Sequence, residues 1–148
     1  MTMNSYQNKI PFSILLIMIF GNLFGQNLDK HKWKNRVLIL QASEKSSIKL
    51  QEQISEFMDE QDDLKERKLV IYQIVGKNHK ILNGTAKNEE WKAVGPAYLV
   101  NKIPFKVTLI GLDGCIKLKQ NKVLKKAELY NRIDSMPMRM SEERRRKN

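Results

Sequence analysis

Residues 43–47, with the sequence SEKSS, place hydroxyl, carboxylate and ammonium groups directly after an apolar run at residues 37–40. The carboxyl end of a buried strand is where α/β proteins usually hold their reactive groups. A helix that begins at such a place lowers the pKa of a thiol at its N-terminus and makes that thiol a nucleophile. The nearest cysteine in the sequence is Cys115, so no small shift in register supplies a thiol here. Dithiol chemistry is therefore not expected at this junction.

The soft metal ligands of the chain are few and scattered. Cys115 is the only cysteine, and His31 and His79 are the only histidines. None of them is paired at a spacing such as CxxC or HxxxH, so we expect neither a metal nor another cofactor. A Ser-His-Asp set is not expected either, because His79 lies in a polar stretch without periodicity. The acidic residues show no spacing that indicates a pair for acid–base catalysis.

Cys115 offers the alternative, enzymatic interpretation. It begins a predicted strand in which Ile116 and Leu118 share one face, while Cys115, Lys117 and Lys119 share the other. On an exposed face the lysines would favour the thiolate, whereas a thiol covered by a helix would be inert. The alternative function is thus a single-cysteine oxidoreductase or peroxidase, although the chain has no second cysteine to resolve an oxidised thiol.

Basic side chains are concentrated in the last third of the chain. The formal net charge is +11 at pH 7, which attracts anions of any kind. The candidate polyanion-binding residues are Lys117, Lys119, Lys122, Lys125, Lys126, Arg144, Arg145, Arg146 and Lys147. The other interpretation is that these residues only form a solvated face and a tail that keeps the protein soluble. Because aromatic residues do not alternate with these cations, sequence-specific nucleic-acid binding is not expected. Acidic glycans or other polyanions, bound in a salt-sensitive way, are the partners to consider.

Hydrophobic periodicity indicates the elements that must position these residues. Apolar runs predict parallel strands at residues 37–40 and 69–75, joined by an amphipathic helix of about four turns that reaches Gln61. An Asp-Gly turn joins antiparallel strands at 105–110 and 115–119, and a helix at 121–136 ends at Pro137. We predict a surface loop at 77–88, a short helix at 89–91, a turn at 97–99 and a frayed basic tail at 141–148. This order predicts an α/β, thioredoxin-like mixed sheet with helices on both faces.

The junction at residues 43–47 can be compared with the position of the two cysteines in the thioredoxin core. When Ala42 is placed on the small residue that ends the first core strand, Lys45 and Ile48 occupy the places of the two cysteines. Neither side chain can form a thiolate. Ile103 and Pro104 precede the third core strand, as an isoleucine and a cis-proline do in thioredoxins, but the sequence does not decide between the cis and trans isomers.

Four stretches indicate a particular family: WKNRVLILQAS, KLVIYQIVG, PFKVTLIGLDGCIKLK and IDSMPMRMSEERRR. With them the chain resembles the thioredoxin-like domain of unknown function 4174, also called P-DUDES, which occurs in exported bacterial proteins and in equarin-like vertebrate matrix proteins. The resemblance spans about residues 28–144. It implies a single secreted domain without a settled activity. We therefore expect a non-catalytic binding protein, associated with the cell envelope or the matrix, whose ligand is unidentified.

The N-terminal residues predict export. One lysine, an apolar segment at residues 10–24 and then Gly25 give the layout of a secretory signal peptide. An uncleaved anchor is the other interpretation, but the apolar segment is short and is interrupted by Pro11 and Gly21. We predict a signal peptide at 1–25, a thioredoxin-like domain at 26–140 and a basic tail at 141–148. The product would be periplasmic or extracellular and would not span a membrane after cleavage.

Two side chains near the first strand have structural interpretations. Trp33 is predicted to cover one end of the core, although it could instead stack on a ligand. Arg36 and Asp134 are predicted to form an exposed ion pair, which would contribute less than about 1 kcal/mol.

Overall fold

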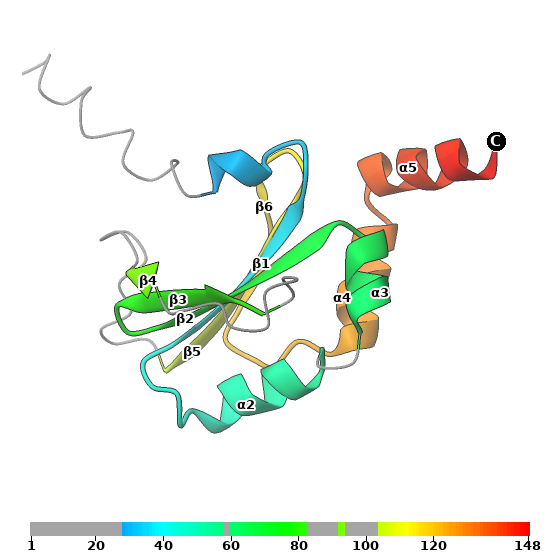
Figure 1. The fold of residues 1–148 in the computed structure, drawn as a ribbon. Coiled ribbons are helices and arrows are strands. Elements are labelled where there is room, and N and C mark those ends of the chain that lie inside the picture. Colours follow the sequence, from blue (N-terminus) through cyan, green and yellow to red (C-terminus); the bar gives the residue numbers. More distant parts are fainter. Residues whose placement is uncertain (1–27, 58–59, 83–91, 94–103) are drawn as a thin grey trace, which may run out of the picture.

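The computed structural model describes residues 28–57, 60–82, 92–93 and 104–148 (Figure 1). The predicted signal peptide at 1–25, the short elements predicted at 89–91 and 97–99, and the isomer of the bond between Ile103 and Pro104 lie outside these residues. The division into a domain at 26–140 and a tail at 141–148 stays a prediction. Within the described ranges, no helix is both long enough and apolar enough to cross a bilayer.

A mixed sheet forms the centre of the fold. Its strands are β1 (Arg36–Ala42), β2 (Leu69–Val75), β3 (Asn78–Ile81), β4 (Lys92–Ala93), β5 (Phe105–Ile110) and β6 (Ile116–Gln120). In the described residues they follow the order β4-β3-β2-β1-β5-β6. β1 pairs in parallel with β2 and antiparallel with β5, and β5 pairs antiparallel with β6. The order β2-β1-β5-β6 is that of a thioredoxin-like core, so the predicted α/β fold class is confirmed.

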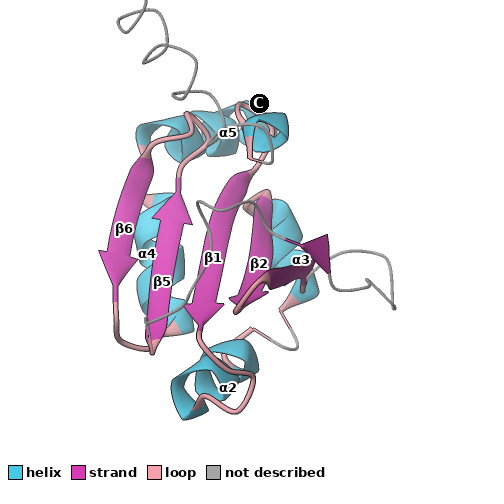
Figure 2. Ribbon diagram, turned by 90° about the vertical axis from the view of Figure 1, so that its left-hand side faces the viewer, coloured by secondary structure: helices cyan, strands magenta, loops and turns pink. Residues whose placement is uncertain are grey.

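The helices of the described residues pack mainly against one face of this sheet. They are η2 (Asp29–His31), α2 (Ile48–Ser55), α3 (Gln61–Glu66), α4 (Lys126–Asp134) and α5 (Pro137–Lys147). On one face, Leu38 shares a buried cluster with Leu64 of α3 and Leu129 of α4, which lie behind the sheet in Figure 2. On the other face, Tyr72 belongs to a second cluster, against which Leu28 at the start of η2 packs.

The helix predicted after residue 43 is two helices, and the helix predicted at 121–136 begins only at Lys126. The late start of α4 comes from a contact between α2 and the residues that precede α4. The buried amide of Gln53 pairs with the backbone N–H and C=O of Leu124, and the carboxylate of Glu56 accepts the N–H of Lys126 at 3.0 Å. The backbone of Leu124 thus makes a tertiary contact instead of a helical turn.

A strand lies where the sequence predicts only a loop. β3 pairs antiparallel with β2, with Val75 opposite Asn78 across a two-residue turn. Gly76 has φ +57° in this turn, a conformation that glycine adopts without steric cost. Because β3 is short, polar and half-exposed, it has no apolar run to mark it.

The C-terminal residues form the helix α5 instead of a frayed tail. Pro137, predicted to end α4, is instead at the first position of α5, where its missing N–H costs nothing. Ion pairs hold the helix to the body of the domain, including Arg36 with Glu142 and Arg139 with Glu66.

The two predictions for side chains near the first strand are wrong. Trp33 is 62% exposed, and it has φ +64°, which turns the chain so that its N–H reaches the carbonyl of Leu112. Arg36 is fully buried and pairs with Glu142. Asp134 instead binds Arg67 and Arg139, because α5 supplies the partner of Arg36.

A pH dependence of stability is expected from His31. Its ring Nε2 lies 2.7 Å from the hydroxyl of Tyr72, and burial lowers the pKa of His31 below its ordinary 6.5. The unfolded state therefore binds a proton before the folded state as the pH falls, so the contribution of neutral His31 is present above pH 6.5 and lost as the pH falls through the lowered pKa. Urea unfolding at pH 7.5 and 5.0 should show a smaller acid destabilisation in His31→Gln than in the wild type. An equal loss in both proteins would contradict this assignment.

Candidate functional site

The junction between β1 and α2 carries no reactive constellation of its own. The hydroxyl of Ser46 donates to the carboxylate of Glu44 at 2.9 Å, and the N–H of Ser47 donates to the carbonyl of Glu44. Lys45 is exposed, and its carbonyl accepts a bond from the amide of Gln51. Ile48 is 75% exposed. The place that holds a dithiol in thioredoxins therefore presents an ammonium group and an aliphatic side chain.

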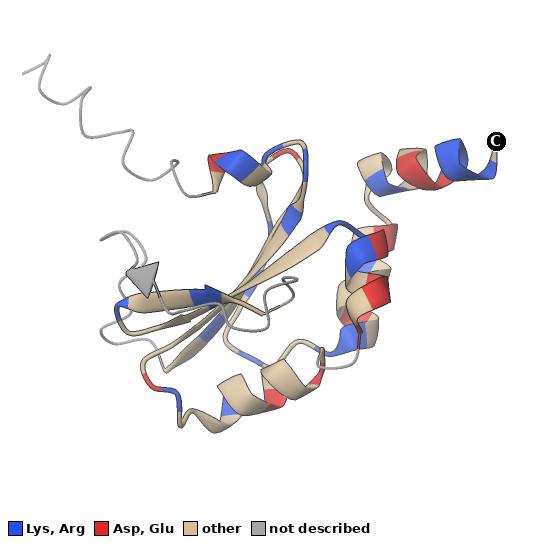
Figure 3. Ribbon diagram, viewed as in Figure 1, with Lys and Arg blue, Asp and Glu red and all other residues tan. Residues whose placement is uncertain are grey.

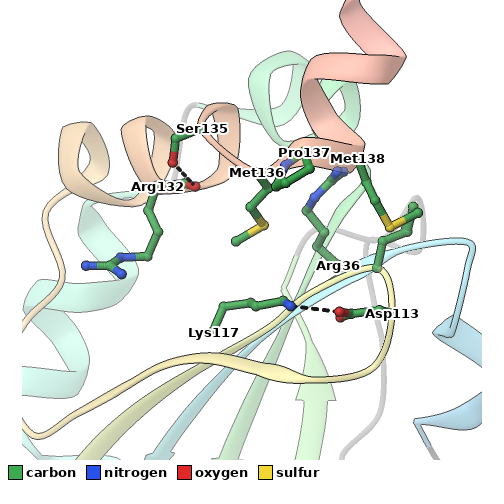
Figure 4. A pocket seen from close by; sticks show the side chains of 9 residues that line it. Arg36, Asp113, Lys117, Arg132, Ser135, Met136, Pro137 and Met138 are labelled. Atoms are coloured by element: carbon green, nitrogen blue, oxygen red, sulfur yellow. Dashed lines mark hydrogen bonds and ion pairs between the residues drawn. The ribbon is translucent and has the colours of Figure 1, made fainter.

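A cavity of about 390 Å³ lies at the opposite end of β1. It is an open pocket bounded by the start of β1, the turn between β5 and β6, and the connection from α4 to α5 (Figure 4). The side chains that line it are Arg36, Leu112, Asp113, Lys117, Arg132, Ser135, Met136, Pro137 and Met138. Its volume is in the range of pockets that bind small molecules.

Three stretches that mark the family resemblance meet in this pocket. Arg36 comes from WKNR, Leu112 and Asp113 from LIGLDG, and Met136 and Met138 from IDSMPMR. They meet because β5 runs antiparallel to β1, so Ile110 at its end pairs with Val37 at the start of β1. The turn after β5 is thereby brought beside Arg36.

Arg36 is the innermost cation of the pocket, with its side chain fully buried. Its Nη1 donates to the carbonyl of Arg67 at 2.9 Å and to the carboxylate of Glu142 at 3.2 Å. Its Nε and Nη2 have no hydrogen-bond acceptor among the residues that the structure describes. Buried donors without acceptors are uncommon in folded proteins, and a bound water or ion is one explanation for them.

Asp113 and Lys117 form the second polar part of the pocket. The Lys117 ammonium donates to the Asp113 carboxylate at 2.7 Å, and the Cys115 N–H donates to the same carboxylate at 3.0 Å. The Lys117 hydrogen bond, with help from the Cys115 N–H, lowers the pKa of Asp113, and Asp113 raises the pKa of Lys117. At Gly111, a Cβ atom would lie 2.5 Å from the Lys117 side chain, so glycine leaves room for this pair.

Arg132 is the third cation, and the sequence analysis did not single it out. It projects from α4 at the edge of the pocket (Figure 4) and is exposed. None of the ion pairs of the described residues includes Arg132, whereas Arg36 and Lys117 each have a carboxylate partner. The only feature of the sequence that could have drawn attention to Arg132 is its position directly before the IDSMPMR stretch.

The predicted polyanion-binding residues do not gather on one surface. Lys125 and Lys126 pair with Glu56 and Glu60 beside α2 and α3. Arg146 pairs with Glu66 and Glu143 near the end of α5, and Lys117 lines the pocket. Figure 3 shows the basic end of α5 far from the basic start of α4. The ion pairs of the described residues do not include Lys119, Lys122, Arg144, Arg145 or Lys147.

Cys115 is a free and exposed thiol in the turn before β6. The strand begins at Ile116, which is itself 60% exposed. The ammonium of Lys117, which could favour a thiolate, is bound to Asp113. In the part of the chain that the structure describes, no three His, Cys, Asp or Glu side chains are placed to hold a metal ion.

The fold and the junction define a thioredoxin-like α/β domain with no cysteine pair at the usual redox position. The family model described as Domain of unknown function (DUF4174) matches residues 27–142, and the chain belongs to that family. The resemblance found in the sequence is thereby confirmed. Comparison with curated proteins and with solved structures finds no match.

Proposed function

We propose that this protein is an exported, non-catalytic binding domain, which acts in the periplasm or outside the cell. One observation carries the proposal: the stretches that mark the family converge on the pocket beside Arg36 and not on the junction after β1. The N-terminal sequence supports export. The net charge of +11 favours anionic partners, among them acidic glycans.

The charge state of the pocket supports binding over proton transfer. A general acid or base works best when its pKa lies near the working pH. The interaction between Asp113 and Lys117 moves both pKa values further from pH 7, because the pKa of Asp113 is lowered and the pKa of Lys117 is raised. Both side chains stay charged near pH 7, which suits a fixed electrostatic surface.

The absence of dithiol activity can be tested with insulin. We expect the purified protein not to accelerate the reduction of insulin disulfides by dithiothreitol, because Lys45 and Ile48 replace the required sulfurs. The measurement is the turbidity of the released insulin B chain, with a thioredoxin as the positive control. A rate comparable to that of thioredoxin would contradict the proposed function.

The same preparation tests the alternative that uses Cys115. The wild type and the Cys115→Ser variant should consume hydrogen peroxide equally slowly in the presence of a thiol reductant. Faster consumption by the wild type alone would favour the single-cysteine peroxidase.

A further inference from the structure

We infer that the pocket beside Arg36 binds a small organic anion: one oxyanion group held by cationic side chains and by the N-terminus of α5, with a short apolar portion against methionines. This inference rests on the proposed binding function and specifies the ligand of the same site. Three independent features of the pocket support it.

The first feature is the unused hydrogen-bonding capacity of Arg36. A guanidinium group can donate five hydrogen bonds in a fixed, planar arrangement that suits oxyanions. Within the described part of the chain, only Nη1 of Arg36 has acceptors, and the buried Nε and Nη2 have none. An oxyanion on the pocket side of Arg36 would supply the acceptors that these two atoms lack.

The second feature is the N-terminus of α5, which forms part of the pocket wall through Met136, Pro137 and Met138. The first N–H groups of a helix have no acceptor within the helix, and no side chain caps them in α5. They also carry the partial positive charge of the helix dipole, so a helix N-terminus favours an anion. Figure 4 shows the start of α5 directly above the side chain of Arg36.

The third feature is the distribution of full charges. Arg36, Lys117 and Arg132 line the pocket with one carboxylate, that of Asp113. Because Asp113 is occupied by Lys117 and by the Cys115 N–H, it does not neutralise Arg132. Arg132 can therefore attract the anion at the entrance, while the buried Arg36 and the start of α5 bind it further in.

The apolar wall indicates that the ligand is more than an inorganic ion. Leu112 is 7% exposed and Met138 is 38% exposed, and Met136 lies between Met138 and Arg132 in the lining (Figure 4). Methionine side chains are flexible and adapt to differently shaped apolar groups. A cavity of about 390 Å³ has room for an anionic group with a short carbon chain.

Titration of the purified protein with n-butyl sulfate tests the inference. Amide shifts in ¹H–¹⁵N NMR spectra should saturate and be largest at Met138, Arg139 and Gly114. Inorganic sulfate should bind about tenfold more weakly, because it cannot use the apolar wall, and n-butyltrimethylammonium should not bind. Arg132→Gln should weaken butyl sulfate binding about tenfold, whereas the control Arg144→Gln, at an exposed arginine of α5, should not change it.

Three results would overturn the inference. They are the absence of saturable binding, equal affinity for inorganic sulfate, and equal weakening by Arg132→Gln and Arg144→Gln. Each can occur while the protein stays inactive toward insulin, in which case only the ligand assignment fails. Insulin reduction at a thioredoxin-like rate would overturn the proposed function whatever the outcome of the titration.

Discussion

Replacing Gln53 with alanine should lower the free energy of unfolding by about 3–4 kcal/mol. Gln53 is fully buried in α2, where its amide nitrogen donates to the Leu124 carbonyl at 2.8 Å and its oxygen accepts the Leu124 N–H at 2.6 Å. Alanine would leave both backbone groups buried without partners, and each such group costs roughly 1–3 kcal/mol. Urea unfolding followed by circular dichroism measures the loss.

Two further variants identify the cause of this loss. Gln53→Leu fills nearly the same volume without hydrogen bonds, so it should destabilise the protein almost as much as alanine. Glu52→Ala changes the neighbouring exposed residue of α2 and should have little effect. If Gln53→Leu were as stable as the wild type, packing and not the pairing with Leu124 would hold α2 against the start of α4.

The contact of Gln53 shows where a sequence limits prediction of this fold. β2 and β5 agree with the predicted strands at 69–75 and 105–110, because continuous apolar runs report burial directly. The start of α4 was missed because it depends on Gln53, a polar residue 71 positions from Leu124. β3 was missed for the opposite reason: its pairing with the neighbouring β2 is local, but its short polar sequence carries no pattern of burial.

The same limit applies to the candidate site. The sequence identified WKNR, LIGLDG and IDSMPMR as marks of a family, but their convergence depends on the antiparallel pairing of β1 with β5. Cys115 and the lysines were selected by residue type alone, and side-chain type does not show that Lys117 is bound to Asp113. Arg132 was missed because nothing in its local sequence distinguishes it from other exposed arginines.

α5 illustrates why charge content alone misleads. Its sequence, PMRMSEERRRK, lacks an apolar face large enough to dock a helix by burial. The lack of apolar residues at 141–148 therefore predicted a frayed tail. The helix is instead attached mainly by charges that lie far away in the chain: Glu142 binds Arg36 and Lys68, and Arg139 binds Glu66. Arg36 is the most buried member of this set, so it should contribute the most.

We therefore expect Arg36→Ala to lower the free energy of unfolding by about 3–5 kcal/mol, the range typical for removal of one partner of a buried ion pair. The variant leaves the carbonyl of Arg67 without its donor and the carboxylate of Glu142, which is only 11% exposed, with Lys68 as its nearest cation. Urea unfolding measures the loss, and Arg144→Ala on the exposed side of α5 should change stability little.

Arg36→Met separates the charge from the packing of the side chain. Methionine keeps much of the aliphatic volume beside Met136 and Met138 but cannot donate to Arg67 or Glu142. If the ion pair and the hydrogen bond carry the stability, Arg36→Met should be nearly as unstable as Arg36→Ala, and α5 should lose its amide protection against hydrogen exchange before the strands do. A stable Arg36→Met variant with a protected α5 would mean that packing holds this helix and that the guanidinium is dispensable for the fold. In that case the charge at this buried position would have to be explained by ligand binding alone.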